Sequence, residues 1–96
     1  MDLIIAYDVN TLTKEGRARL RRVARICEGH GQRVQESLFE CTVNETQRER
    51  LRQRLTKIIA PAEDSLRIYQ LRGGREGAVE VHGLDRYVAF DGVLIG

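Results

Sequence analysis

The chain has 96 residues, a hydrophobic fraction of 42%, a charged fraction of 31% and a formal net charge of +2. This length allows one domain with one modest core, and such chains often complete their burial by pairing with a second copy. No apolar run approaches the roughly 20 residues of a membrane-spanning helix, and the amino terminus lacks a secretory signal pattern. We therefore expect a cytoplasmic protein.

Arginine dominates the basic residues. Among the 16 cationic side chains, Lys14 and Lys57 are the lysines and the other 14 are arginines. The guanidinium group is planar, stays charged and matches the geometry of phosphate, so this bias favours a polyanionic partner.

A short, nearly unbroken apolar run at residues 3–10 predicts a strand that is buried on both faces. Asp8 closes this run, and Asn10, Thr11 and Thr13 follow it as typical residues of a strand end and a helix start. Two roles are open for Asp8. Its side chain either caps the turn into the first helix or acts as a ligand at a strand end.

The segment from Thr13 to about Glu28 has the apolar spacing of a helix that packs against a sheet. Its predicted buried face comprises Leu20, Val23, Ala24 and Cys27. Another face carries Arg17, Arg21 and Arg25 four residues apart, with Arg19 and Arg22 nearby. Five arginines in nine residues without an acid are unusual for a merely solubilising face.

The middle of the chain predicts a second strand and a second helix. Arg33–Val43 has mixed alternation, with Phe39 and Cys41 on one face and Leu38 on the other. Asn44 and Gln47 have the spacing of a capping box, and the helix should end near Ile59 because Pro61 follows.

Two further strands are predicted after this helix, at Ser65–Leu71 and at Ala78–Val81, with the glycines of residues 73–77 as a hairpin connection. These glycines do not form a phosphate loop, since no helix or GK[ST] sequence follows. Residues 87–96 contain more strand-like sequence than one small sheet needs, and docking on a second subunit would cover it.

The cysteines and histidines do not indicate a separate site. Cys27 and Cys41 lack metal-ligand spacing and are expected to be buried free thiols. His30 and His82 are expected in loops, because neither has a recognisable catalytic partner.

Strand–helix–strand, twice, within ninety residues indicates an α+β, ferredoxin-like βαββαβ fold with two helices on one face of an antiparallel sheet. We expect one domain, with residues 1–86 as the core and 87–96 as a strand that docks on the partner. A face-to-face dimer would cover the other sheet face and bring two copies of Asp8 towards each other.

Three segments resemble the small universal CRISPR-associated adaptation protein family, the companion of the spacer integrase. These segments are residues 4–9 (IIAYDV), 33–40 (RVQESLFE) and 64–69 (DSLRIY). The length and the order of the elements agree as well, so the resemblance covers essentially the whole chain.

The resemblance implies a homodimer that bridges integrase dimers and binds the duplex DNA of a prospective spacer, a task that does not require nuclease activity. It also implies a metal-dependent endonuclease for single-stranded RNA or double-stranded DNA. In that reading Asp8 of each subunit is the catalytic residue and the metal ligand, and one weakly held Mg²⁺ lies at the dimer interface.

The resemblance further places Arg17 or Arg19, Arg33 and Phe39 near the site, with Ser37 beside them. Together with the helix stripe, the expected nucleic-acid-binding residues are Arg17, Arg19, Arg21, Arg25 and Arg33. Ser37 is expected to be structural, because no histidine lies close in sequence. The alternative function is a non-catalytic, ferredoxin-like dimeric regulatory or interaction module, which predicts no nucleic-acid binding.

Overall fold

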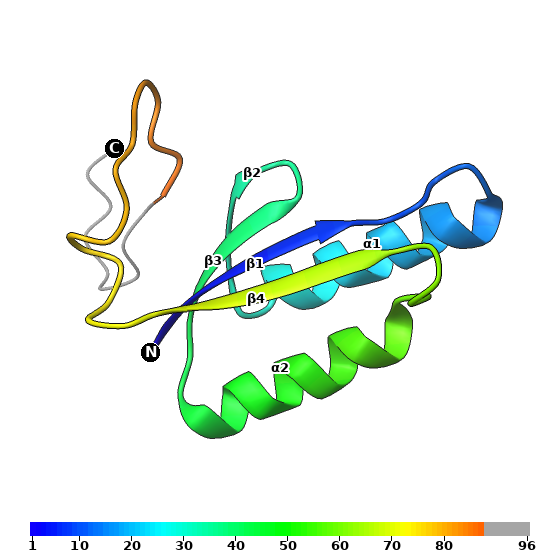
Figure 1. Cartoon of the computed structure of the whole chain (residues 1–96), viewed down its shortest axis with the longest axis horizontal. Coiled ribbons are helices and arrows are strands. Elements are labelled where there is room, and N and C mark those ends of the chain that lie inside the picture. Colours follow the sequence, from blue (N-terminus) through cyan, green and yellow to red (C-terminus); the bar gives the residue numbers. More distant parts are fainter. Residues whose placement is uncertain (88–96) are drawn as a thin grey trace.

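The computed structural model describes residues 1–87, which form a four-stranded sheet and two helices. The strands are β1 (Asp2–Asp8), β2 (Gly31–Gln35), β3 (Leu38–Thr42) and β4 (Ser65–Leu71), and the helices are α1 (Lys14–Glu28) and α2 (Glu45–Ile58). All neighbouring strands are antiparallel, in the order β2-β3-β1-β4, with the helices running alongside the sheet (Figure 1). This βαββαβ arrangement confirms the predicted ferredoxin-like fold.

Strand β1 lies at the centre of the core, and its side chains alternate between two environments. Leu3, Ile5 and Tyr7 face the helices and are at most 5% exposed. Ile4 and Ala6 are half-buried on the other face, which we call the open face. The prediction of burial on both faces was therefore wrong for β1, because the helices cover only one face of the sheet.

Both helices contribute apolar residues to the core at helical spacing. Val23 and Cys27 of α1 and Leu51 and Leu55 of α2 are fully buried, and the partly buried Leu20 packs against them. The α1 residues belong to the face predicted for that helix, which confirms its amphipathic pattern.

Side-chain caps define where the two helices begin. Thr13 accepts a hydrogen bond from the backbone N–H of Gly16 at 3.0 Å. Asn44 accepts one from the N–H of Gln47 at 2.8 Å, and the Gln47 side chain accepts one from the N–H of Asn44 at 2.9 Å. The predicted capping box is thus confirmed.

The segment predicted as one strand, Arg33–Val43, contains a hairpin. Strands β2 and β3 are joined by a turn at Glu36 and Ser37, and their register shifts between Arg33 and Gln35. The turn lacks the Asn-Gly or Asp-Gly pair that marks short hairpins, so the mixed alternation resembled one longer strand.

The predicted strand at Ala78–Val81 does not form in the structure. The backbone N–H groups of Ala78 and Val79 bond to the carbonyl of Arg75, which closes a local turn. Gly73 and Gly74, with φ of 84° and 88°, form the predicted turn after β4, but it does not lead into a hairpin strand.

Arg75 fastens this segment to the sheet. Its backbone N–H donates to Asp2 at 2.7 Å and its Nε to the buried Glu40 at 2.6 Å. The guanidinium carbon lies 3.9 Å from the ring centre of Tyr87. Figure 1 shows the segment at the end of the sheet where β1 begins. The predicted tail strand lies outside the described residues after Tyr87.

Within residues 1–87, neither helix has the length and apolar character required to cross a membrane.

Candidate metal and nucleic-acid site

Asp8 is the last residue of β1 and is exposed on the open face. In the register with β4 it lies opposite Ser65, which is also exposed. Within residues 1–87, no hydrogen bond or ion pair involves the Asp8 carboxylate. The turn into α1 is instead capped by Thr13, while Asn10 accepts a hydrogen bond from Leu12 N–H at 2.9 Å. The turn role that was open for Asp8 is therefore filled by other residues.

The donor set around Asp8 determines which ion it fits. Within the described part of the chain, no cluster of three or more His, Cys, Asp or Glu side chains is arranged to hold a metal. One exposed carboxylate with a serine hydroxyl as its register neighbour offers only oxygen donors, which suits a hard cation such as Mg²⁺ that keeps several waters. A single chain would hold such an ion weakly.

Asp64 lies directly behind this strand end and is enclosed by donors. Its side chain is 0% exposed, and it forms a two-point contact with Arg19, at 2.8 Å from Nε and 3.2 Å from Nη2. It also accepts hydrogen bonds from the backbone N–H groups of Asn10 at 3.0 Å and Ala60 at 2.8 Å. We call Asp64 and Arg19, with these two N–H groups, the Asp64 clamp.

The Asp64 clamp is an ionised structural unit. The hydrogen bonds from Arg19, assisted by those from Ala60 and Asn10, outweigh burial and lower the pKa of Asp64 to about 2. The Arg19 side chain is only 14% exposed and lies 3.7 Å from Glu63 as well. Arg19 thus differs from the other arginines of its helix, because its charge is already paired.

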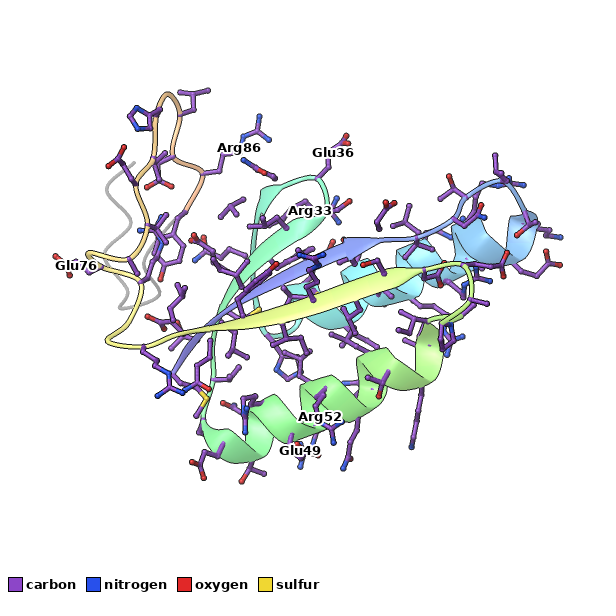
Figure 2. The ribbon with its side chains drawn as sticks, in the orientation of Figure 1. Arg33, Glu36, Glu49, Arg52, Glu76 and Arg86 are labelled. Atoms are coloured by element: carbon purple, nitrogen blue, oxygen red, sulfur yellow. The ribbon has the colours of Figure 1, made fainter. Side chains whose placement is uncertain are left out.

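Arg33, Phe39 and Ser37 surround β1 from the side opposite β4. Phe39 is fully buried on the helix-facing side and stacks on Tyr7, with ring centres 6.1 Å apart. Arg33 lies over the Phe39 ring at 5.2 Å and pairs with Glu28 at 3.0 Å. Figure 2 labels Arg33, which belongs to β2, and Glu36, which lies in the hairpin turn that follows.

Ser37 is hydrogen-bonded through its backbone to Tyr7, the residue before Asp8. Its carbonyl accepts a hydrogen bond from the N–H of Tyr7 at 3.1 Å, and its side chain is exposed. The structure therefore brings Ser37 beside the strand end. Phe39 supports that end from the core and does not share a face with Asp8, because it lies opposite Ile5 in the register.

The remaining predicted arginines, Arg17, Arg21 and Arg25, are exposed along α1. Arg17 donates to the carbonyl of Thr11 at 3.2 Å, so it lies against the loop that follows β1. Within residues 1–87, none of the three has an acidic partner, which leaves their charges available to an external anion.

A groove between the two helices gathers further positive charge. It is lined by two apolar and four cationic side chains, namely Ile26, Ile58, Arg22, Arg25, Arg54 and Lys57. We call it the interhelical groove. No acidic residue lines it, whereas elsewhere on α2 Arg52 pairs with Glu49, as Figure 2 shows.

The pKa of His30 is affected by nearby arginines, one of which, Arg54, lines this groove. Burial, followed by the charges of Arg54 and Arg50, holds the pKa of His30 below its usual value. After burial, the positive charges of these two arginines are the further cause that disfavours protonation of His30.

The cysteines are the buried free thiols that were predicted. Burial raises the pKa of Cys27 to about 12 and that of Cys41 to about 11. Both thiols are protonated at neutral pH, so they act as core residues.

These observations define a small ferredoxin-like protein with an unpaired carboxylate at the end of its central strand and an arginine-rich helical layer. The family model described as CRISPR associated protein Cas2 matches residues 1–78. The chain belongs to this family.

Individual relatives and structures agree with this assignment. The CRISPR-associated endoribonuclease Cas2 1 of Moorella thermoacetica is 46% identical over 95 residues, covering 99% of both chains. The CRISPR-associated endonuclease Cas2 of Halalkalibacterium halodurans is 43% identical, with the same coverage. The crystal structure of Streptococcus pyogenes Cas2 has a TM-score of 0.77 and 46% identity, and it covers 86% of this chain and 100% of its own.

Sequence reasoning missed three parts of the site. Asp64 belongs to segment 64–69, which carries the resemblance, but no structural role was predicted for it, although a carboxylate just before a strand can accept hydrogen bonds from backbone N–H groups. No role in the site was predicted for Arg54 and Lys57 of the second helix. Their meeting with α1 depends on how the helices pack, which the sequence pattern does not specify.

Proposed function

We propose that this chain acts in CRISPR adaptation as a homodimer that binds duplex DNA and bridges integrase dimers. We further propose that its two Asp8 carboxylates hold one Mg²⁺ and give it endonuclease activity on RNA or DNA. The observation that carries the proposal is the unpaired, exposed Asp8 on the open face of a Cas2-family fold.

The placement of Asp8 supports a site that is shared by two copies. The open face lacks a helical cover, and half-buried apolar side chains such as Ile4 and Leu38 lie on it. Pairing of two open faces would bury these side chains and bring two carboxylates together. A bound Mg²⁺ would supply an activated water and charge stabilisation for phosphodiester hydrolysis.

The nucleic-acid surface is proposed to comprise the exposed α1 stripe and the interhelical groove. Their cations, Arg17, Arg21, Arg22, Arg25, Arg54 and Lys57, would contact phosphates without reading bases. Arg33 lies on the hairpin side and is paired with Glu28, so we propose a supporting role for it at the edge of this surface.

The first experiment compares Asp8→Asn with Glu76→Gln in cleavage of single-stranded RNA and duplex DNA with Mg²⁺. Glu76 is an exposed carboxylate beside the start of β1, at the opposite end of the strand from Asp8, and serves as the control (Figure 2). The proposal predicts cleavage by the wild type and Glu76→Gln, at least about a hundredfold loss in Asp8→Asn, and unchanged duplex binding. Cleavage that survives in Asp8→Asn would refute the catalytic assignment.

The second experiment tests the nucleic-acid surface with two matched double variants. Arg25→Gln with Arg54→Gln removes two groove charges, while Arg52→Gln with Arg86→Gln removes two charges outside it. Only the groove variant should weaken duplex binding, and the slope of log affinity against log salt should fall by about 2. Equal duplex affinity for both double variants would refute the interhelical groove as a DNA-binding surface and would favour the non-catalytic interaction module.

A further inference from the structure

The end of β1 is held by contacts that lie behind Asp8 rather than on it. Two residues after Asp8, the Asn10 N–H donates to Asp64 at 3.0 Å. Asp64 immediately precedes Ser65, the register partner of Asp8. The clamp thus joins the backbone leaving β1 to the backbone entering β4 at the point where Asp8 projects.

The clamp also ties this point to both helices. Arg19 reaches it from α1 with a two-point contact, and Ala60, just after α2, donates its N–H at 2.8 Å. A planar guanidinium with two parallel hydrogen bonds restricts orientation as well as distance. With its side chain 0% exposed, Asp64 has no route to bind a cation or a nucleic acid directly.

A second observation shows how closely this loop is fitted. A Cβ atom on Gly16 would lie 1.8 Å from the carbonyl oxygen of Asn10, so the first turn of α1 rests directly on the loop. Asn10 is therefore held on one side by Asp64 and on the other by Gly16. The Asp8 side chain, two residues away, makes no hydrogen bond or ion pair among residues 1–87, so its position depends on this backbone.

We propose that Asp64 is a positioning residue, which acts with Arg19 to hold the end of β1 so that the Asp8 carboxylate can bind a divalent cation. This inference rests on the cation-binding role proposed above for Asp8. It assigns Arg19 to the support of Asp8 and separates it from the exposed arginines of α1, which are left to contact phosphate.

The test measures Mn²⁺ affinity by electron paramagnetic resonance in the intact protein. Asp64→Asn preserves shape and removes the charge. The double variant Asp64→Asn with Arg19→Gln removes both partners and leaves no buried unpaired charge. Both should bind Mn²⁺ about tenfold more weakly than the wild type, the lower end of the effect of residues that orient a metal ligand.

Two controls separate positioning from general stability. Glu63→Gln makes the same acid-to-amide change at an adjacent residue that contacts Arg19 at 3.7 Å, and should keep wild-type affinity. Leu51→Ala removes a buried core contact on α2, and should lower thermal stability while keeping Mn²⁺ affinity. Circular dichroism confirms that each variant is folded at the temperature used.

The outcomes identify which claim fails. Wild-type Mn²⁺ affinity in both clamp variants would overturn the inference and leave Asp8 as the proposed ligand. An equal loss in Leu51→Ala would also overturn it, because the effect would then follow stability alone. Absence of Asp8-dependent Mn²⁺ binding in the wild type would overturn the proposed function itself.

Discussion

At the residue scale, the backbone of the loop after β1 is held in place by close contacts near the candidate site. Asn10 contacts Asp64 through its N–H, and its carbonyl lies against Gly16. Gly16 is buried at the start of α1, in a position where alanine would normally strengthen a helix. Packing and helix propensity therefore act in opposite directions at this residue.

Gly16→Ala should destabilise the protein despite the better helix propensity of alanine. The added Cβ would meet the Asn10 carbonyl, a backbone atom with little freedom to move. Overpacking should cost about 1–3 kcal/mol in the free energy of unfolding, against a propensity gain of about 1 kcal/mol. Urea denaturation measures the difference, with Gly29→Ala as a control because its nearest contact is 3.4 Å. A Gly16→Ala variant that is more stable than the wild type would contradict the close approach of Gly16 to the Asn10 carbonyl.

Asp64 should make stability sensitive to acid. Its pKa is lowered from 3.8 to about 2 by Arg19 and the backbone N–H groups, so the charged form favours the folded state. Its contribution is fully present above 3.8 and is lost as the pH falls through about 2. Thermal unfolding across this window should show a smaller decline for Asp64→Asn than for the wild type. Parallel declines would show that other carboxylates control acid unfolding.

At the element scale, the helices were more predictable than the hairpin and the groove. The apolar spacing of α1 and the Asn44–Gln47 capping box are local signals, and both are present in the structure. The turn at Glu36 and Ser37 lacks a strong local signal and was missed. Asp8 could be predicted as a candidate ligand because it ends a strand. The Asp64 clamp could not be predicted, because it joins residues that are far apart in sequence and meet only in the folded chain.

Arg54→Gln should raise the pKa of His30. The charge of Arg54 is one reason why this pKa is low, so its removal makes protonation of the imidazole easier, while burial continues to lower the value. NMR titration of the imidazole signals measures the shift. Arg52→Gln is the matched control, because Arg52 is paired with Glu49. The same shift in both variants, or in neither, would contradict the charge distribution assigned to the interhelical groove.

At the scale of the whole molecule, Arg75 links the sheet to the chain that leads towards the carboxyl terminus. It contacts Glu40 in the sheet and Asp85 and Tyr87 in the following segment. Residues 79–84 contribute Val79, Val81 and Leu84 to a hollow shared with Ile4 and Leu38 of the open face. Part of that face is therefore covered within one chain, and we propose that a second copy covers the rest.

Deletion of residues 88–96 should weaken dimerisation. This segment holds Val88, Phe90, Val93, Leu94 and Ile95, and loss of about 3 kcal/mol of apolar burial would weaken association on the order of a hundredfold. Sedimentation equilibrium of the full chain and of a chain ending at Tyr87 measures this change. An unchanged monomer–dimer equilibrium would refute the proposed docking of the tail on the partner.

The central proposal is that two chains share one cation through their Asp8 carboxylates, and Mn²⁺ stoichiometry at high protein concentration tests it most directly. We predict half an equivalent of Mn²⁺ per chain in the dimer, with binding lost in Asp8→Asn and retained in Glu76→Gln. A full equivalent per chain, or equal binding by Asp8→Asn, would contradict a shared site at the end of β1.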